Sequence, residues 1–151
     1  MACSFCAIVA GQLEASVVAE TASALAFLDL RQLVPGHVLV VPRQHVENIY
    51  AIDPIIAGDV MQLGVRVARA LRAAFDPPGL NLWQSNGHAG GQEVPHFHLH
   101  VQPRRIADGL LRVYPQGLPA HAPRDVLDQM AERIRSSLPF DGVSPAPRST
   151  P

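Results

Sequence analysis

The chain of 151 residues is 48% hydrophobic and 17% charged, a composition that fits one globular domain with an apolar core. Its formal net charge of -1 gives no bulk electrostatic basis for binding nucleic acid or a membrane surface, so we expect neither as a partner. The first residues lack the basic start and long apolar run of a signal peptide, and no stretch has the length of a membrane span; we therefore expect a cytoplasmic protein.

Two cysteines stand near the start of the chain, Cys3 and Cys6. A structural disulfide is unusual in the cytoplasm, which leaves a metal half-site, a redox pair or two chance cysteines. A thioredoxin-like redox motif would follow a strand, and no strand is expected before these residues. Two thiolates at this spacing are ordinary zinc ligands, and tetrahedral zinc needs two more ligands. Those ligands would have to be histidines.

Three short strands are expected next. Residues 16–20 and 24–29 flank a short turn and predict a hairpin, and residues 38–41 form an apolar run that ends at Pro42. His37 opens the third strand and His45 follows it. On these residues alone, each histidine is equally compatible with a place in the core and with a functional role.

A long helix is the clearest secondary-structure prediction. Asp53 can cap it and Pro54 fits its first turn, while Pro77 and Pro78 prevent it from continuing beyond about Asp76. Its apolar residues recur every three or four positions and predict a core-facing stripe: Ile56, Val60, Leu63, Val67, Leu71 and Ala74. Three arginines on the opposite face are expected to be solvated: Arg66, Arg69 and Arg72.

A fourth strand over residues 80–85 leads into the glycine-rich stretch 86–93, which runs directly into the histidines. Glycine lets the backbone approach a ligand closely, and successive N–H groups can form an anion-binding concavity. The stretch lacks the Gly-Lys-Ser/Thr ending of a Walker loop. Next to three histidines, it suggests a phosphate cradle.

Residues 95–102 contain three histidines at every second position, His96, His98 and His100. Strict alternation with Phe97, Leu99 and Val101 predicts a strand whose apolar side chains face the core and whose imidazoles line the other face. A row of imidazoles suggests proton transfer, nucleophilic attack or metal binding. On an extended strand its two ends lie ~13 Å apart, so one end member must have a separate role.

The remaining sequence predicts a shorter helix over residues 124–138 and a disordered tail rich in proline and serine over residues 139–151. We therefore expect one domain over residues 1–138. The order of elements predicts an α+β fold, with a five-stranded, mainly antiparallel sheet packed with one long and one shorter helix.

The run His96-Phe97-His98-Leu99-His100-Val101-Gln102 resembles the signature of the histidine triad (HIT) family, with Gln102 in place of the usual apolar last residue. The resemblance extends in the expected order over residues 3–105, through Leu25-Ala26-Phe27-Leu28-Asp29, Pro35-Gly36-His37-Val38-Leu39-Val40, His45-Val46-Glu47-Asn48 and Gly90-Gly91-Gln92-Glu93-Val94-Pro95. It implies the HIT-like fold and a homodimer formed through the long helix and the strand at residues 80–85.

The resemblance also implies an enzyme that hydrolyses purine nucleoside monophosphate derivatives through a covalent nucleotidyl-histidine. By position, His98 would be the nucleophile, with His37 and His100 beside it. Nucleotide-binding residues would be Phe27, Leu28, Asp29, Asn86, Gly91, Gln92, Glu93 and Val94. Glu93 stands where the phosphoramidase branch often has a hydroxyl. Structural zinc would be held by Cys3, Cys6, His45 and His96.

Three alternatives remain open at this point. The histidine row could itself hold a catalytic zinc, as in a metallohydrolase, or the chain could bind nucleotides without turnover. A nucleotidyltransferase would require His-x-His-x-Gln, and Gln102 lies two residues too late for that motif. Three leaving groups are compatible with hydrolysis: an amine from a phosphoramidate, a second nucleotide from a dinucleoside polyphosphate, or sulfate from adenosine phosphosulfate.

Overall fold

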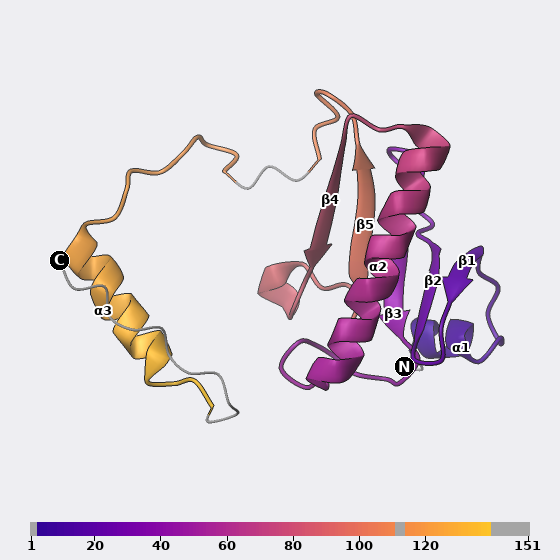
Figure 1. The fold of residues 1–151 in the computed structure, drawn as a ribbon, viewed down its shortest axis with the longest axis horizontal. Coiled ribbons are helices and arrows are strands. Elements are labelled where there is room, and N and C mark those ends of the chain that lie inside the picture. The colour runs from indigo at the N-terminus through magenta and orange to yellow at the C-terminus, as the bar shows by residue number, and fades with distance from the viewer. Residues whose placement is uncertain (1–2, 111–113, 140–151) are drawn as a thin grey trace. The chain divides into compact units, whose positions relative to one another are not determined.

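The computed structural model describes residues 3–110 and 114–139. The chain divides into two compact units, Met1–Leu110 and Leu111–Pro151, and each is described by itself. Figure 1 traces the strands and the long helix of the first unit. The predicted tail falls, apart from Pro139, outside the described residues.

A five-stranded antiparallel sheet forms the first unit, as predicted. Its strands are β1 Val17–Glu20, β2 Ala24–Leu28, β3 Val38–Pro42, β4 Gly79–Gln84 and β5 Leu99–Arg104. They lie in the order β1-β2-β3-β5-β4, and every neighbouring pair is antiparallel. This order places β5 between β3 and β4, so the histidine segment reaches the middle of the sheet.

The long helix α2, Pro54–Phe75, begins and ends where its sequence predicts. The Asp53 side chain accepts a hydrogen bond of 2.7 Å from the Ile55 N–H, and Asp76 ends the helix in the left-handed conformation. The buried stripe packs on one sheet face, together with the apolar side chains of β2, β3 and β5. Helix and sheet approach so closely that a Cβ on Gly64 would lie 2.8 Å from Leu99 Cδ2.

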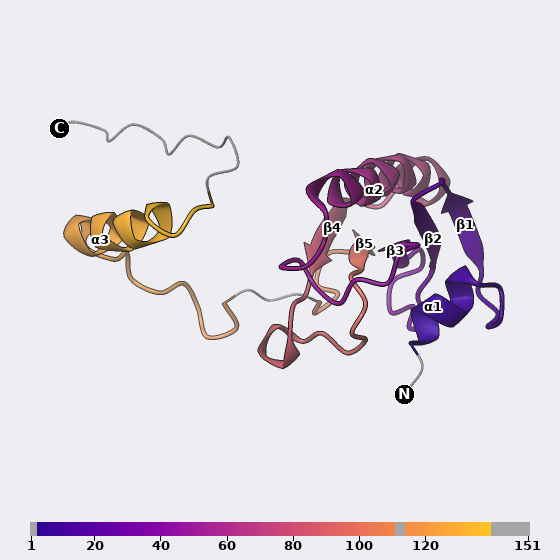
Figure 2. The same ribbon diagram turned by 90° about the horizontal axis from the view of Figure 1, so that it is seen from below.

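A short helix that the sequence analysis did not predict, α1 Ser4–Val9, lies on the opposite side of the sheet from α2 (Figure 2). Cys3 occupies its N-cap position without a side-chain cap hydrogen bond. Phe5 packs with Leu25, Phe27 and Leu39 in a second apolar cluster. The sheet therefore has a core on each face, and α1 brings both cysteines to the face away from α2.

The predicted histidine strand over residues 95–102 is corrected at its start, because β5 begins only at Leu99. The preceding backbone bonds elsewhere: His96 N–H donates to Val94 C=O at 2.8 Å and Phe97 N–H to Val46 C=O at 2.6 Å. The predicted alternation of side chains between the two faces is still present, because Phe97, Leu99 and Val101 all lie in the core under α2.

The second unit contains α3, Arg124–Arg135, which ends three residues before the predicted Leu138. The hydroxyls of Ser136 and Ser137 donate to Arg133 C=O and end the helix. Among the described residues, no helix has the length and apolar character needed to cross a bilayer.

Candidate functional site

The His98 imidazole is buried, with 5% of the residue exposed, on the sheet face that carries α1. Its Nδ1 lies 2.6 Å from His96 C=O, an acceptor, so Nδ1 carries the proton and Nε2 keeps its lone pair. Phe5 contacts the ring edge-on, with the centroids 5.3 Å apart. Burial lowers the pKa of His98 below its ordinary value. The ring is thus a neutral imidazole with a defined tautomer.

His37 and His100 form a hydrogen-bonded pair beside His98. His37 Nε2 lies 2.9 Å from His100 Nδ1, and the His98 and His100 ring centroids are 4.8 Å apart. His37 Nδ1 lies 3.3 Å from Arg31 C=O, which accepts from it, so the Nε2 atom of His37 faces His100. Burial, followed by the charges of His98 and His37, lowers the pKa of His100 to about 3.

Trp83 on β4 supports this pair from the neighbouring strand. It stands opposite His100 in the β4–β5 register, and the two rings stack with centroids 4.2 Å apart at an angle of 5°. It also stacks on His37 at 5.5 Å. This role of Trp83 is not predicted from the sequence, because a strand pattern does not give the register between strands.

The segment between β2 and β3 carries Asp29 and His37 and is held by Gln32. The Gln32 amide nitrogen donates to Asp29 C=O at 2.7 Å and to His37 C=O at 2.8 Å. Its amide oxygen accepts from Gly36 N–H at 2.9 Å and from His37 N–H at 3.0 Å. Gly36 has φ +99°, and a Cβ there would lie 2.9 Å from Leu71 Cδ2. The His37 ring is therefore placed by the backbone around it.

The glycine-rich loop contains a 3-10 turn, His88–Gly90, and the left-handed Gly91. Asn86 accepts from Ile49 N–H at 2.8 Å and donates to Gln84 Oε1 at 2.5 Å. The Gln92 amide accepts from Gly87 N–H and donates to Glu47 C=O and Val94 C=O. Both side chains thus build the loop, and their predicted contact with substrate phosphate stays a prediction.

Arg31 and Glu93 connect the two loops at the surface. Arg31 Nη1 donates to Glu93 Oε1 at 3.1 Å and to Oε2 at 2.8 Å. Asp29, which is partly buried, accepts from Arg31 N–H at 2.6 Å and lies 3.8 Å from His37 Nδ1. Glu93 was predicted as a site residue from the sequence, whereas Arg31 was not, because no motif contains it.

The other predicted nucleotide-binding residues lie at both loops. Phe27 is buried, Leu28 is 37% exposed at the end of β2, and Val94 packs beside the α1-side core. Leu28 is therefore accessible at the end of β2, whereas Phe27 lies in the α1-side core.

A second cluster, distinct from His98, contains Cys3, Cys6, His45 and His96, whose donor atoms all lie within 4.8 Å of one another. Cys3 Sγ is 3.4 Å and Cys6 Sγ is 3.6 Å from His96 Nδ1, and Cys6 Sγ is 3.3 Å from His45 Nδ1. His96 Nε2 donates to Pro42 C=O at 2.9 Å, which leaves the Nδ1 lone pair facing the thiols.

This donor set matches the chemistry of zinc: two thiols and two imidazoles, one of which is held in place by its hydrogen bond to Pro42 C=O. Burial and the adjacent Cys3 raise the pKa of the Cys6 thiol, an effect that a bound cation would reverse. The fit is therefore good for a closed structural site. In the described part of the chain the row His96, His98 and His100 forms no such cluster, whereas Asp29, His37 and His100 do.

Sequence comparisons point to one family. The HIT domain matches residues 10–107 of this chain. The chain is 37% identical over 139 residues to "Protein hit" of Bacillus subtilis, covering 89% of this chain and 96% of that protein. It is 36% identical over 104 residues to the adenosine 5'-monophosphoramidase hnt1 of Schizosaccharomyces pombe, covering 69% of this chain and 75% of that enzyme.

Solved structures agree with this result. A HIT family member from Bacillus subtilis has a TM-score of 0.85 at 34% identity, covering 93% of this chain and 100% of that chain. A zinc-bound histidine triad family protein from Mycobacterium smegmatis has a TM-score of 0.69 at 38% identity, covering 74% of this chain and 81% of that chain.

Proposed function

Because this chain belongs to the HIT family, we propose that it is a nucleotide hydrolase that releases a nucleoside monophosphate through a covalent adduct on His98. The relative from Schizosaccharomyces pombe is an adenosine 5'-monophosphoramidase, which supports a purine nucleoside phosphoramidate as one substrate. A dinucleoside polyphosphate is the second substrate class.

One observation carries the proposal: His98 is a buried, neutral imidazole with Nδ1 bonded to His96 C=O and Nε2 free. Neutral imidazole is a nucleophile at neutral pH, and the adduct splits one displacement into two easier steps. Nε2 bonds to the α-phosphorus while the leaving group departs with the electron pair of its bond. Water then bonds to phosphorus, the P–Nε2 bond breaks, and the water proton passes to solvent.

The neighbouring side chains position these steps. His37 Nε2 and His100 Nδ1 are hydrogen-bonded at 2.9 Å, and Trp83 stacks on both rings. The three rings therefore form a rigid surface beside His98. Asp29 is available for the ribose hydroxyls, and the N–H groups of the glycine-rich loop are available for phosphate oxygens. Fixed groups of this kind lower the barrier because they require no reorganisation when charge develops.

Rapid quenching during turnover of adenosine 5'-phosphoramidate tests the mechanism. We expect an acid-labile AMP group on the peptide that contains His98, and no adduct in His98→Asn. The His121→Asn variant, changed in the second unit, is the matched control and should form the adduct. AMP binding without adduct or turnover would instead identify a nucleotide-binding module, and turnover by His98→Asn would favour metal-activated water.

We also propose that Cys3, Cys6, His45 and His96 hold structural zinc. Four protein ligands would leave no open position for a reacting water, so the ion would attach α1 to the segment before β5. The zinc-bound relative from Mycobacterium smegmatis supports this proposal. The bound ion would stabilise the fold and fix the position of residues 96–100.

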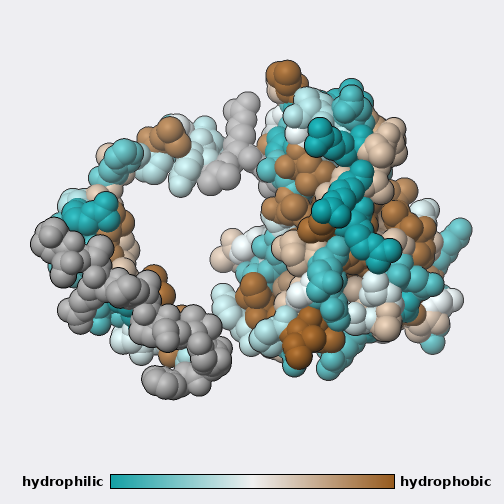
Figure 3. Space-filling view, viewed as in Figure 1, coloured by the Kyte–Doolittle hydropathy of each residue, from teal (hydrophilic) through white to brown (hydrophobic). Residues whose placement is uncertain are grey.

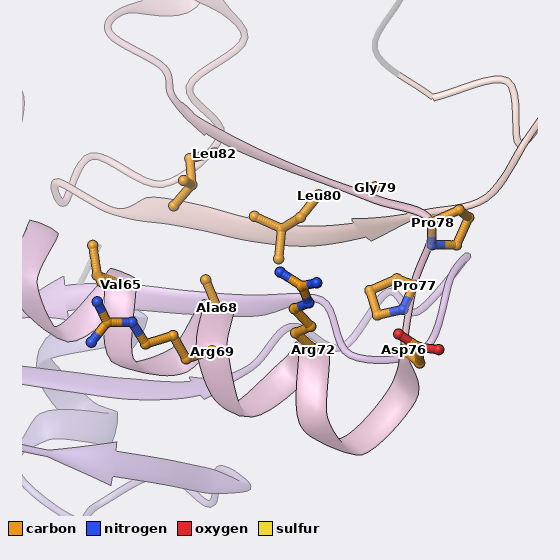
Figure 4. A pocket seen from close by; sticks show the side chains of 10 residues that line it. All are labelled: Val65, Ala68, Arg69, Arg72, Asp76, Pro77, Pro78, Gly79, Leu80 and Leu82. Carbon is orange, nitrogen blue, oxygen red and sulfur yellow. The ribbon is translucent and has the colours of Figure 1, made fainter.

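A homodimer through α2 and β4 completes the proposal. β4 is the last strand of the sheet, so one of its edges has no strand neighbour among the described residues. A pocket between α2 and β4 is lined mainly by apolar residues, and its charged lining residues are Arg69, Arg72 and Asp76 (Figure 4). Val65 and Leu82 are 40% and 42% exposed there, and Figure 3 shows hydrophobic surface beside the hydrophilic side chains of α2. An uncovered strand edge with an apolar surface favours association with another copy.

Sedimentation velocity at micromolar concentration tests the dimer. The unmodified chain should sediment as a dimer, and Leu82→Glu should shift it to monomer because it places a charge in the interface. Val18→Glu, an exposed position on the opposite edge strand β1, is the control and should remain dimeric. A monomer in the unmodified protein would refute the assembly.

A further inference from the structure

An ion pair between Arg31 and Glu93 joins the two loops that carry the proposed substrate contacts. The guanidinium makes two hydrogen bonds to the carboxylate, at 3.1 and 2.8 Å. The Arg31 backbone is anchored at both ends, since its N–H donates to Asp29 and its C=O accepts from His37. Glu93 lies in the opposite loop, three residues before His96. We call this pair the Arg31–Glu93 clasp.

The clasp lies on the solvent side of the proposed reaction. His98 is 5% exposed, whereas the side chains of Arg31 and Glu93 are 81% and 71% exposed. In an in-line displacement the leaving group departs on the side of phosphorus away from the nucleophile. With a buried nucleophile, that direction leads toward solvent, between the two loops that the clasp connects.

The charges at this exit are unusual for a site that accepts a polyanion. Asp29 contributes a carboxylate beside the histidines, with its Oδ2 3.8 Å from His37 Nδ1. Arg31 brings a guanidinium to these loops, and Glu93 compensates its charge with a bidentate contact. A leaving group with several negative charges would therefore pass the Glu93 carboxylate and the Arg31 guanidinium, whose charge Glu93 already neutralises.

From this arrangement we infer that the Arg31–Glu93 clasp selects leaving groups by charge, favouring amines over polyphosphates. The inference rests on the proposed hydrolase function and narrows its substrate class to phosphoramidates. With such a substrate, the P–N bond to the amine breaks as His98 Nε2 bonds to phosphorus. The amine takes the electron pair and one proton from solvent, and leaves without carrying negative charge past Glu93.

Calorimetric binding of AMP and ATP tests the charge filter directly, because ATP extends AMP by two phosphates on the leaving-group side. Glu93→Gln uncovers Arg31, so the ratio Kd(ATP)/Kd(AMP) should fall about tenfold at low salt. Arg31→Gln leaves Glu93 uncompensated and should raise the same ratio several-fold. The double variant Arg31→Gln/Glu93→Gln should return the ratio to within about threefold of the unmodified chain, since both charges are gone.

Two further measurements sharpen this test. The changes should shrink at 0.5 M salt, because exposed charges are screened over a few ångströms there. In turnover, Glu93→Gln should raise kcat/KM for diadenosine tetraphosphate relative to adenosine 5'-phosphoramidate by a similar factor. Glu47→Gln, which changes an exposed carboxylate outside the clasp, is the control and should leave both ratios unaltered.

Failure of this inference is distinguishable from failure of the proposed function. Intact AMP binding and turnover, with a Kd ratio that stays within twofold in Glu93→Gln, would overturn the charge filter alone. A chain that binds neither nucleotide and forms no adduct would overturn the proposed function and the filter together.

Discussion

His96 and His98 are two residues apart, and they use different ring nitrogens in two different sites. One site is the Cys/His cluster, and the other contains the His37–His100 pair. His96 donates from Nε2 to Pro42 C=O and directs Nδ1 toward two thiols. His98 donates from Nδ1 to His96 C=O and keeps Nε2 free beside the His37–His100 pair. Burial lowers the pKa of both rings, so both are neutral at pH 7.

In each region one backbone carbonyl determines which ring nitrogen carries the proton: Pro42 C=O for His96 and His96 C=O for His98. A carbonyl accepts a proton and cannot donate one, so whichever ring nitrogen contacts it becomes the N–H and the other nitrogen becomes the reactive atom. The same residue type is therefore proposed for metal binding in one place and for attack on phosphorus in the other. Variants that separate stability from turnover test this division.

The largest expected effect is on turnover in His98→Asn. Asn preserves a polar side chain but lacks the attacking nitrogen, so kcat should fall by at least ~10³-fold while zinc content stays stoichiometric. His96→Asn is the matched comparison, and it should lose zinc and lose far less of its turnover when folded. Steady-state kinetics and metal analysis on both proteins provide the measurement. Equal losses of turnover and zinc in the two variants would remove the distinction between the sites.

The second effect is on stability, in Cys3→Ala. Removing one ligand should release the metal and lower the free energy of unfolding by roughly 3 kcal/mol, or about 10 °C in Tm. Thermal unfolding of the zinc-loaded proteins measures this, and Ser4→Ala, an exposed neighbour in α1, is the control. If Cys3→Ala keeps stoichiometric zinc, the four-ligand site is wrong.

Much of the fold could be predicted from local patterns. Alternation and turn residues gave the strands, and the Asp53 cap with Pro54 gave the start of α2, because these signals act over a few residues. α1 escaped prediction because Cys3 provides no cap hydrogen bond and the helix has six residues, too few for a periodic stripe. The early start predicted for β5 was wrong because residues 95–98 bond to loops that are distant in sequence.

Residues of the candidate site could be predicted from the sequence only where they belong to a recognisable motif. The resemblance brought together Cys3, Cys6, His45 and His96, which the structure indeed clusters. Trp83 was missed because its stack on His100 depends on the β4–β5 register. Gln32 was missed because its four hydrogen bonds exist only once the loop has closed.

A smaller effect is expected from Gln32, and it should reduce turnover at His98 without changing zinc binding. Gln32→Leu removes all four hydrogen bonds around His37, so kcat should fall about tenfold with little change in KM, and zinc should remain bound. Gln32→Glu retains an acceptor for the Gly36 and His37 N–H groups and should lose less. The downfield NMR signal of the proton between His37 and His100 should weaken in Gln32→Leu. A normal signal with reduced kcat would contradict the positioning role.

The smallest effect is a pH dependence of stability that belongs to His100. Its pKa is about 3 in the folded chain and near 6.5 when unfolded, mainly because of burial. Between these values the unfolded chain binds one more proton than the folded chain, so stability is present above pH 6.5 and decreases on acidification.

For this single group, we expect a loss of about 1 kcal/mol between pH 7 and pH 5.5. Urea unfolding of the unmodified chain and of His100→Gln, both with excess zinc, isolates this effect, because proton competition at the thiols is common to the two proteins. The unmodified chain should show the steeper decrease with acidification. Identical slopes would mean that His100 is as accessible to protons in the folded chain as in the unfolded chain, and the buried state of His100 beside the proposed nucleophile would have to be abandoned.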